Sequence, residues 1–162
     1  MITNKSGFYW LSYLCLVLMG SSAVQAGELR EFYIKTVHID GNANIKGDDK
    51  HPAEAFVTEG LPEGRGLQIT KPNEYGAWKI RAFTFTPSQM VVREGDDVRL
   101  HFIGVQGLHH GIHVEGNGVD EKFTLTRGVI KTIDFKSVKE GSIEIECYDH
   151  LPLMTAEVLV LP

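Results

Sequence analysis

The stretch "GSIEIECY", residues 141–148, decides the fold because apolar and polar side chains alternate along it. Ile143 and Ile145 share one face, and two glutamates share the other. This alternation is typical of a β-strand that turns one face to a core and the other to solvent. Cys147 continues the apolar face, so we expect its thiol to point into the core at the end of the strand.

Similar short runs recur along the chain, with Gly, Pro or acidic turns between them and no convincing amphipathic helix. They cover residues 29–39, 77–87, 89–104, 109–116, 123–135, 141–148 and 155–162. The run 89–104 reads as two strands joined by a solvated acidic turn, Glu94–Asp97, and Arg127–Gly128 is expected to be another turn. This pattern predicts an all-β Greek-key sandwich or barrel of seven to eight strands.

Residues 40–76 differ from this pattern because they are polar and carry Gly and Pro at short intervals. They predict a long loop or loose hairpin, with a helical turn over 53–57. We therefore expect three parts: a leader, 1–26, an N-terminal strand with a loop or hairpin extension, 27–76, and a β domain, 77–162.

The leader has the features of a secretory signal peptide. Lys5 is its only charged side chain, an apolar run follows over 8–19, and a small-x-small sequence ends at Ala26. We expect cleavage after Ala26, a mature chain that starts at Gly27, and a periplasmic or secreted protein with no membrane segment left. A retained N-terminal anchor is the alternative.

Cleavage would leave one cysteine and an acidic chain. Of the two cysteines, Cys15 would leave with the signal and Cys147 would stay, so either metal ligation or burial must protect a lone thiol in an oxidising compartment. Without Lys5, 15 basic and 21 acidic residues give a formal charge of −6. This charge predicts no nucleic-acid partner and favours basic protein partners.

The stretch "CYDHLPLM", residues 147–154, places three metal-binding side chains in one loop: Cys147, His150 and Met154. A loop that folds back can bring the three together, and a fourth ligand must then come from another strand. The remaining histidines are His38, His51, His101, His109, His110 and His113.

Strand alternation selects among these histidines. In "HHGIHV", His110 falls on the same face as Ile112 and Val114, which is the apolar and therefore inner face. We take His110 as the fourth ligand and His113 as the alternative. His101 is expected to be a solvated outer-face residue, and His38 lies far from any motif.

The resulting set, His110, Cys147, His150 and Met154, has two imidazoles, one thiolate and one thioether. This set suits mononuclear copper in an electron-transfer site. Zinc takes further thiolates or histidines more often than a thioether. A binuclear copper site would need a second thiolate, and the His-x-His pairs of a multicopper oxidase are missing.

The stretches "FTFTPSQMVVREGDDVRLHF", "HHGIHV" and "CYDHLPLM" resemble the cupredoxins over residues 77–162. The pair His110-Gly111 also resembles the ligand histidine in the copper domains of nitrous oxide reductase and cytochrome c oxidase subunit II. The resemblance implies a cupredoxin fold and a type 1 (blue) copper site.

The stretch "KIRAFTFTPSQMVVREGDDV" is similar to nitrosocyanin, a red copper protein. That family has a Glu ligand where this chain has His110, and a second loop histidine where it has Met154. The difference favours a blue site. In nitrosocyanin-like proteins an N-terminal hairpin helps to build an oligomer, which implies the same role for residues 27–76.

The function expected from these features is a periplasmic carrier of single electrons between redox partners, not an enzyme. Leu108, Leu151, Pro152 and Leu153 would form an apolar docking patch around His150. Two alternatives stay open: a copper delivery or storage protein, and a red-copper-like protein with an open coordination position.

Overall fold

The computed structural model describes residues 27–43, Phe56 and 59–162. These residues form two five-stranded β-sheets. The first sheet has the order β2-β3-β1-β5-β8 and the second β4-β10-β9-β6-β7. Both sheets are mixed, because β1 runs parallel to β5 and β4 runs parallel to β10. No helix in these residues has the length and apolarity of a membrane span.

The first sheet contains β1 (Leu29–Ala43), β2 (Leu67–Ile69), β3 (Trp78–Thr86), β5 (Asp97–Gly104) and β8 (Ile130–Lys136). The second contains β4 (Gln89–Arg93), β6 (His109–Gly116), β7 (Val119–Thr126), β9 (Gly141–Cys147) and β10 (Thr155–Leu161).

The core lies between the two sheets and follows the predicted alternation. Val98, Leu100 and Phe102 of β5 are buried, as are Ile143 and Ile145 of β9. Apolar side chains from both sheets complete one cluster: Ile34, Phe83, Phe85, Met90, Val92, Ile112, Val114, Leu125, Ile133, Cys147, Met154, Ala156, Val158 and Val160. Its burial is the main driving force for folding.

The predicted all-β sandwich is confirmed, but the described residues form ten strands, not seven or eight. The run 123–135 forms two strands on either side of Arg127–Gly128, where Gly128 has a φ of 79°. Of the residues 40–76 predicted to be a loop or hairpin, 40–43 belong to β1, and Leu67–Ile69 form the short strand β2, which pairs with β3. The predicted signal 1–26 and helical turn 53–57 lie outside the described residues, apart from Phe56.

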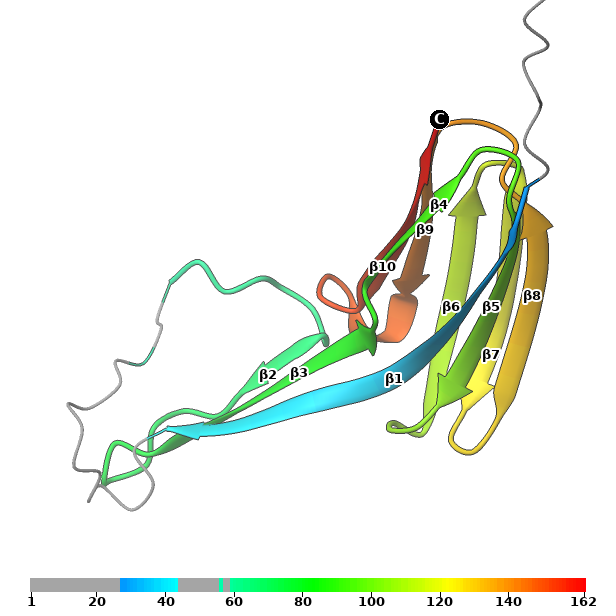
Figure 1. Ribbon diagram of the computed structural model, residues 1–162. Coiled ribbons are helices and arrows are strands. Elements are labelled where there is room, and N and C mark those ends of the chain that lie inside the picture. The colour runs from blue at the N-terminus through cyan, green and yellow to red at the C-terminus, as the bar shows by residue number, and fades with distance from the viewer. Residues whose placement is uncertain (1–26, 44–55, 57–58) are drawn as a thin grey trace, which may run out of the picture.

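β1 and β3 run out of the sandwich and, with β2, form a three-stranded ribbon (Figure 1). The register pairs Ala43 with Trp78 at the far end of this ribbon. Within β3 the buried face changes along the strand: Phe83 and Phe85 face the sandwich core, whereas Trp78 is half-buried in the ribbon, where the Phe56 ring lies 5.6 Å away.

The sequence predicted a solvated turn between β4 and β5. This prediction is wrong for Asp96, which is only 4% exposed. Its carboxylate accepts hydrogen bonds from the backbone N–H of Arg93 and of Glu28, both at 2.9 Å, and from Arg30 Nε at 3.3 Å. The Arg93 bond, then the Glu28 bond, hold the pKa of Asp96 below its usual value. Asp96 therefore ties the start of β1 to this turn.

Candidate metal centre

Three donor atoms converge at one end of the sandwich. Cys147 ends β9, His110 lies in β6, and His150 lies in η2 (Tyr148–His150), the turn that follows β9. Cys147 Sγ is 3.5 Å from His110 Nδ1 and 3.4 Å from His150 Nδ1. All three donor atoms lie within 4.8 Å of one another, so the structure brings together three of the four predicted ligands.

Strand pairing explains why His110 and Cys147 meet. β6 and β9 are antiparallel neighbours, and Ile112 lies opposite Cys147. His110, two residues from Ile112, therefore shares its inner face and is only 1% exposed. The inner face of β6 is the one predicted from the sequence.

The loop 147–154 closes on itself through its backbone. Cys147 N–H donates to the Met154 carbonyl at 3.0 Å, and Met154 N–H donates to the His150 carbonyl at 3.1 Å. Met154 is completely buried at the end of this loop. Its place as an axial ligand stays a prediction.

Both imidazoles are held by their surroundings. His110 Nε2–H donates to the Gln106 carbonyl at 2.6 Å, an assignment that leaves the Nδ1 lone pair facing Cys147. The His150 ring stacks on Phe83 with a centroid distance of 3.9 Å and an interplanar angle of 19°. An ion bonded to sulfur and nitrogen in a trigonal plane would keep a sulfur and a nitrogen donor roughly 3.7 to 3.8 Å apart. The two observed Sγ–Nδ1 distances, 3.5 and 3.4 Å, are slightly shorter than this.

Burial sets the protonation of the three groups. It raises the pKa of the Cys147 thiol to about 11, and it lowers the pKa of His110 and of His150 below the ordinary imidazole value of 6.5. Near neutral pH the metal-free site therefore holds a protonated thiol and two neutral imidazoles. Binding of a metal ion by these three groups would therefore release one proton, from the Cys147 thiol.

A short segment of the extension packs against the ligand loop. We call residues 64–66 the strap. Gly66 N–H donates to the Leu151 carbonyl at 3.1 Å, and the Gly66 carbonyl accepts from Phe83 N–H at 2.9 Å. A Cβ at Gly66 would overlap the His150 carbonyl oxygen, and one at Gly64 would overlap that of Leu151. Only glycine permits this close approach of the two backbones.

A third glycine, Gly107, lies close to the His110 imidazole. Its φ is 89°, and a Cβ there would overlap His110 Nε2. The loop between β5 and β6 can therefore lie directly over the imidazole edge that bonds to the Gln106 carbonyl. Strand alternation does not identify Gly107, Gln106, Phe83 or the strap as parts of the site, and the glycines at 64, 66 and 107 are the signal that the sequence offers for them.

Asp149 connects the ligand loop to β6. Its Oδ2 accepts a hydrogen bond from Gly111 N–H at 2.6 Å, and its Oδ1 lies 3.8 Å from Nε2 of the exposed His109. The residue is half-buried.

His113 lies outside the cluster of donors. It is 8% exposed, and its ring joins the Tyr148 hydroxyl at 2.6 Å to Asp120 Oδ1 at 2.7 Å. His113, the alternative ligand predicted from the sequence, is thus a buried neighbour of the residue after Cys147 and not a member of the donor cluster.

Two further histidines differ from their predicted surroundings, and His51 lies outside the described residues. His101 is on the outer face of β5, as predicted. It is half-buried and not fully solvated, and Glu31 and Thr132 bond to its two ring nitrogens at 2.7 and 2.8 Å. His38 was predicted to be far from the site, yet its ring centroid lies 5.7 Å from Phe83, which stacks on His150. Both environments arise because β1 is inserted between β3 and β5.

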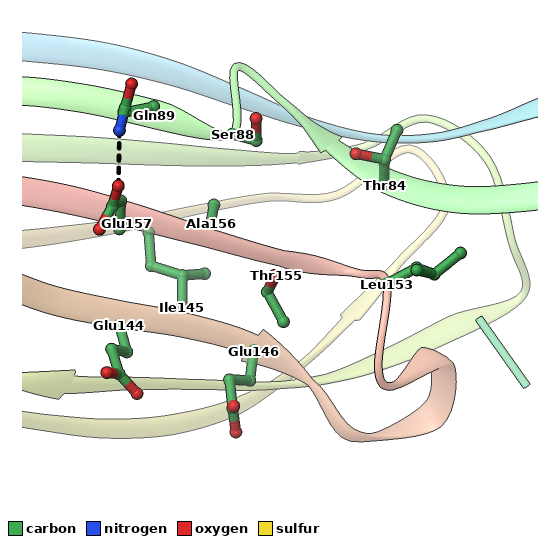
Figure 2. Close-up of a pocket in the computed structure, with 10 residues that line it drawn as sticks. All are labelled: Thr84, Ser88, Gln89, Glu144, Ile145, Glu146, Leu153, Thr155, Ala156 and Glu157. Carbon is green, nitrogen blue, oxygen red and sulfur yellow. Dashed lines mark hydrogen bonds between the residues drawn. The ribbon is translucent and has the colours of Figure 1, made fainter. Parts of the chain in front are cut away.

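A separate groove lies on the outer face of the second sheet, with a cavity volume of about 640 Å³. Figure 2 shows its three carboxylates, Glu144, Glu146 and Glu157, the last of which accepts a hydrogen bond from Gln89 at 2.6 Å. Leu153 of the ligand loop lines one end of this groove, which contains none of the three donors. The groove is an acidic surface that begins beside the ligand loop.

No protein-family model and no curated protein matches the chain. Among solved structures, a multi-copper oxidase from Pseudomonas thermotolerans is 12% identical and aligns with a TM-score of 0.51 over 84% of this chain and 30% of its own. A second multicopper oxidase, mgLAC, is 19% identical with a TM-score of 0.49, over 84% and 39%. Dithionite-reduced auracyanin from Roseiflexus castenholzii is 15% identical with a TM-score of 0.37, over 49% and 88%. The chain thus spans less than half the length of either oxidase.

The fold is a cupredoxin-like β-sandwich, as the sequence resemblance implied. It holds a buried cysteine between two imidazoles at the end of the sandwich, an arrangement that can bind a metal ion.

Proposed function

We propose that the protein binds one copper ion through His110, Cys147 and His150, with Met154 as a weak axial ligand, and carries single electrons between redox partners. The observation that carries this proposal is the single thiol with an imidazole Nδ1 atom at 3.5 Å on one side and at 3.4 Å on the other. One thiolate, two imidazoles and a thioether are the donors of mononuclear copper electron-transfer sites.

Copper supplies reversible one-electron chemistry when bound, and the chain keeps the donors fixed. The Gln106 carbonyl fixes the His110 ring, and the Phe83 ring fixes His150. The strap and the backbone bonds within 147–154 hold the loop itself. Ligands that barely move between two oxidation states keep the reorganisation energy of electron transfer small.

Electrons would enter and leave through the edge of His150, which is the least buried of the three donors. Leu108 and Leu153, 82% and 37% exposed, supply apolar surface near it. The groove with Glu144, Glu146 and Glu157 supplies negative charge next to the same loop. A redox partner with a basic surface complements this charge.

The expected leader assigns the protein to the periplasm or to secretion, and the ribbon of β1, β2 and β3 offers a surface for an oligomer. N-terminal sequencing and intact mass of exported protein test the first assignment, with Gly27 as the expected first residue. Sedimentation of the mature protein tests the second.

Copper retention through redox cycles is the deciding experiment. The oxidised protein should show intense thiolate-to-copper charge transfer in the visible range, and this band should vanish on reduction and return on reoxidation. Copper should stay bound throughout in the presence of a chelator. Cys147→Ser should remove the band, because a hydroxyl is a poorer copper donor than a thiolate. Met154→Leu should keep the band and shift the reduction potential.

Other outcomes would replace the proposal. Ready loss of Cu(I) to the chelator would favour a delivery or storage protein. Retained copper without a reversible redox wave would favour an enzyme with an open coordination position.

A further inference from the structure

A second cavity, of about 400 Å³, opens directly beside His150. We call it the Arg65 cleft, and its lining residues are Arg65, Gln68, Phe83, Gly107, Leu108, His109, Asp149 and His150. Residues 65–68 of the extension form one wall, and residues 107–109 form another. Arg65 of the strap, the loop at 107–109 and His150 of the ligand loop therefore meet around one cleft.

The cleft has the composition of a small-molecule site. Leu108, Phe83 and Gly107 give it apolar surface, and Leu108 is 82% exposed. Gln68 adds an amide. Small-molecule sites are typically concave, mostly apolar and about 300 to 1,000 Å³ in volume, with a few polar groups that fix orientation.

Arg65 supplies an unpaired positive charge. Arg30, Arg81 and Arg99 each pair with an aspartate, whereas no carboxylate in the described part of the chain pairs with Arg65. The carboxylate that lines the cleft, Asp149, already accepts the Gly111 N–H bond and has its other oxygen near His109. A guanidinium is a planar donor that matches a carboxylate through two parallel hydrogen bonds.

We propose that the Arg65 cleft binds a small organic carboxylate with an apolar body. The carboxylate pairs with the Arg65 guanidinium, and the apolar body lies on Leu108 next to the edge of His150. This site is a property of the strap and the 107–109 loop, so it goes beyond electron transfer and does not require that the ion be copper.

Benzoate and its neutral isostere benzamide test this site. Each is titrated into the reduced, metal-loaded protein and, separately, into the metal-free protein, with amide chemical shifts as the readout. Saturable shifts should cluster at Gly66, Gly107 and Leu108. Benzoate should bind about fivefold more tightly than benzamide, the factor that corresponds to about 1 kcal/mol for an accessible ion pair.

Two arginine variants separate the cleft from general attraction of anions. Arg65→Gln should abolish the preference for benzoate, while Arg127→Gln should keep it. Arg127 is a matched control because it is exposed, lies outside the cleft, and has no ion-pair partner among the described residues. Leu108→Ala should weaken benzoate and benzamide to the same degree.

Shifts that do not saturate, equal affinity for the two ligands, or equal loss in both arginine variants would overturn the proposal. Failure of the copper proposal would leave the titration of metal-free protein unchanged, so the two can fail separately.

Discussion

His110 is oriented from both sides of its ring. Nε2 bonds to the Gln106 carbonyl and Nδ1 faces the Cys147 sulfur, so either ring flip or ring rotation would break a contact. His113 lies on the same strand, but its two ring nitrogens are already occupied by Tyr148 and Asp120. The chemistry of each imidazole thus follows from what its second nitrogen contacts.

His110→Ala should therefore abolish or strongly alter the visible copper spectrum, and His113→Ala should leave it nearly intact. Absorption and electron paramagnetic resonance of the copper-loaded variants measure this. If the His113 variant is bleached while the His110 variant is not, the inner face of β6 has been assigned incorrectly.

Gly107→Ala should lower the free energy of unfolding by more than the positive φ at this position alone would cause. The backbone conformation costs an alanine about 1 kcal/mol, and the new Cβ would in addition displace the His110 ring. We expect a total loss of about 2 to 3 kcal/mol in the free energy of unfolding, by urea denaturation, together with a changed copper spectrum.

Gly128→Ala is the matched control for this effect. Gly128 has a φ of 79°, close to that of Gly107, and a Cβ there would meet nothing within 4 Å. Its variant should lose about 1 kcal/mol and keep the spectrum unchanged. Equal losses and unchanged spectra in both variants would refute a role for Gly107 in placing His110.

At the scale of elements, the strap fixes the ligand loop as a unit. Gly66 bonds to Leu151 through its N–H and to Phe83 through its carbonyl, so one residue connects the loop to β3, whose Phe83 ring stacks on His150. The loop is therefore held by an element more than eighty residues earlier in the chain.

Gly66→Ala should push the loop away because its Cβ would overlap the His150 carbonyl. Copper release to a competing chelator should accelerate, and the free energy of unfolding should fall by about 1 to 3 kcal/mol. Gly60→Ala serves as the control for copper release, since a Cβ at Gly60 has open space around it. Its φ of 74° strains an alanine there, so the two variants are compared by copper release and not by stability. Equal copper release from the two variants would show that the strap does not hold the site.

The parts of this site that sequence could predict are those that depend on local alternation. The inward directions of Cys147 and His110 follow from the alternation of apolar and polar residues in β9 and β6. In the structure both side chains are buried. The burial of Asp96, the covering of His101 and the approach of His38 depend on where β1 inserts. Its parallel pairing with β5 joins residues about seventy positions apart, and no local pattern encodes it.

At the scale of the whole molecule, the burial of His110 and His150 as neutral imidazoles makes the free energy of unfolding depend on pH. The pKa values of His110 and His150 are lowered in the folded state, chiefly by burial, so the unfolded chain binds more protons as the pH falls. Their contribution to stability is fully present above the unfolded value of 6.5 and is lost as the pH falls through the folded values. Metal-free protein should thus be less stable at about pH 5 than at about pH 7.5.

Urea unfolding at the two pH values measures this difference. A His110→Leu variant should show a smaller difference, because it removes one of the two groups that must charge on unfolding. An unchanged difference would mean that other groups cause the pH dependence.

The position of β1 in the first sheet also sets an order of events during synthesis. β1 leaves the ribosome before either of its neighbours, β3 and β5, so it can pair with them only after both have been synthesised. The strap follows β1, His110 follows β5, and Cys147 and His150 come nearly last. The cage of His110, Cys147 and His150 is therefore incomplete until His150 has emerged. Under the proposed export, the ion that fills this cage would be selected by the compartment in which folding finishes and not by the one in which translation starts.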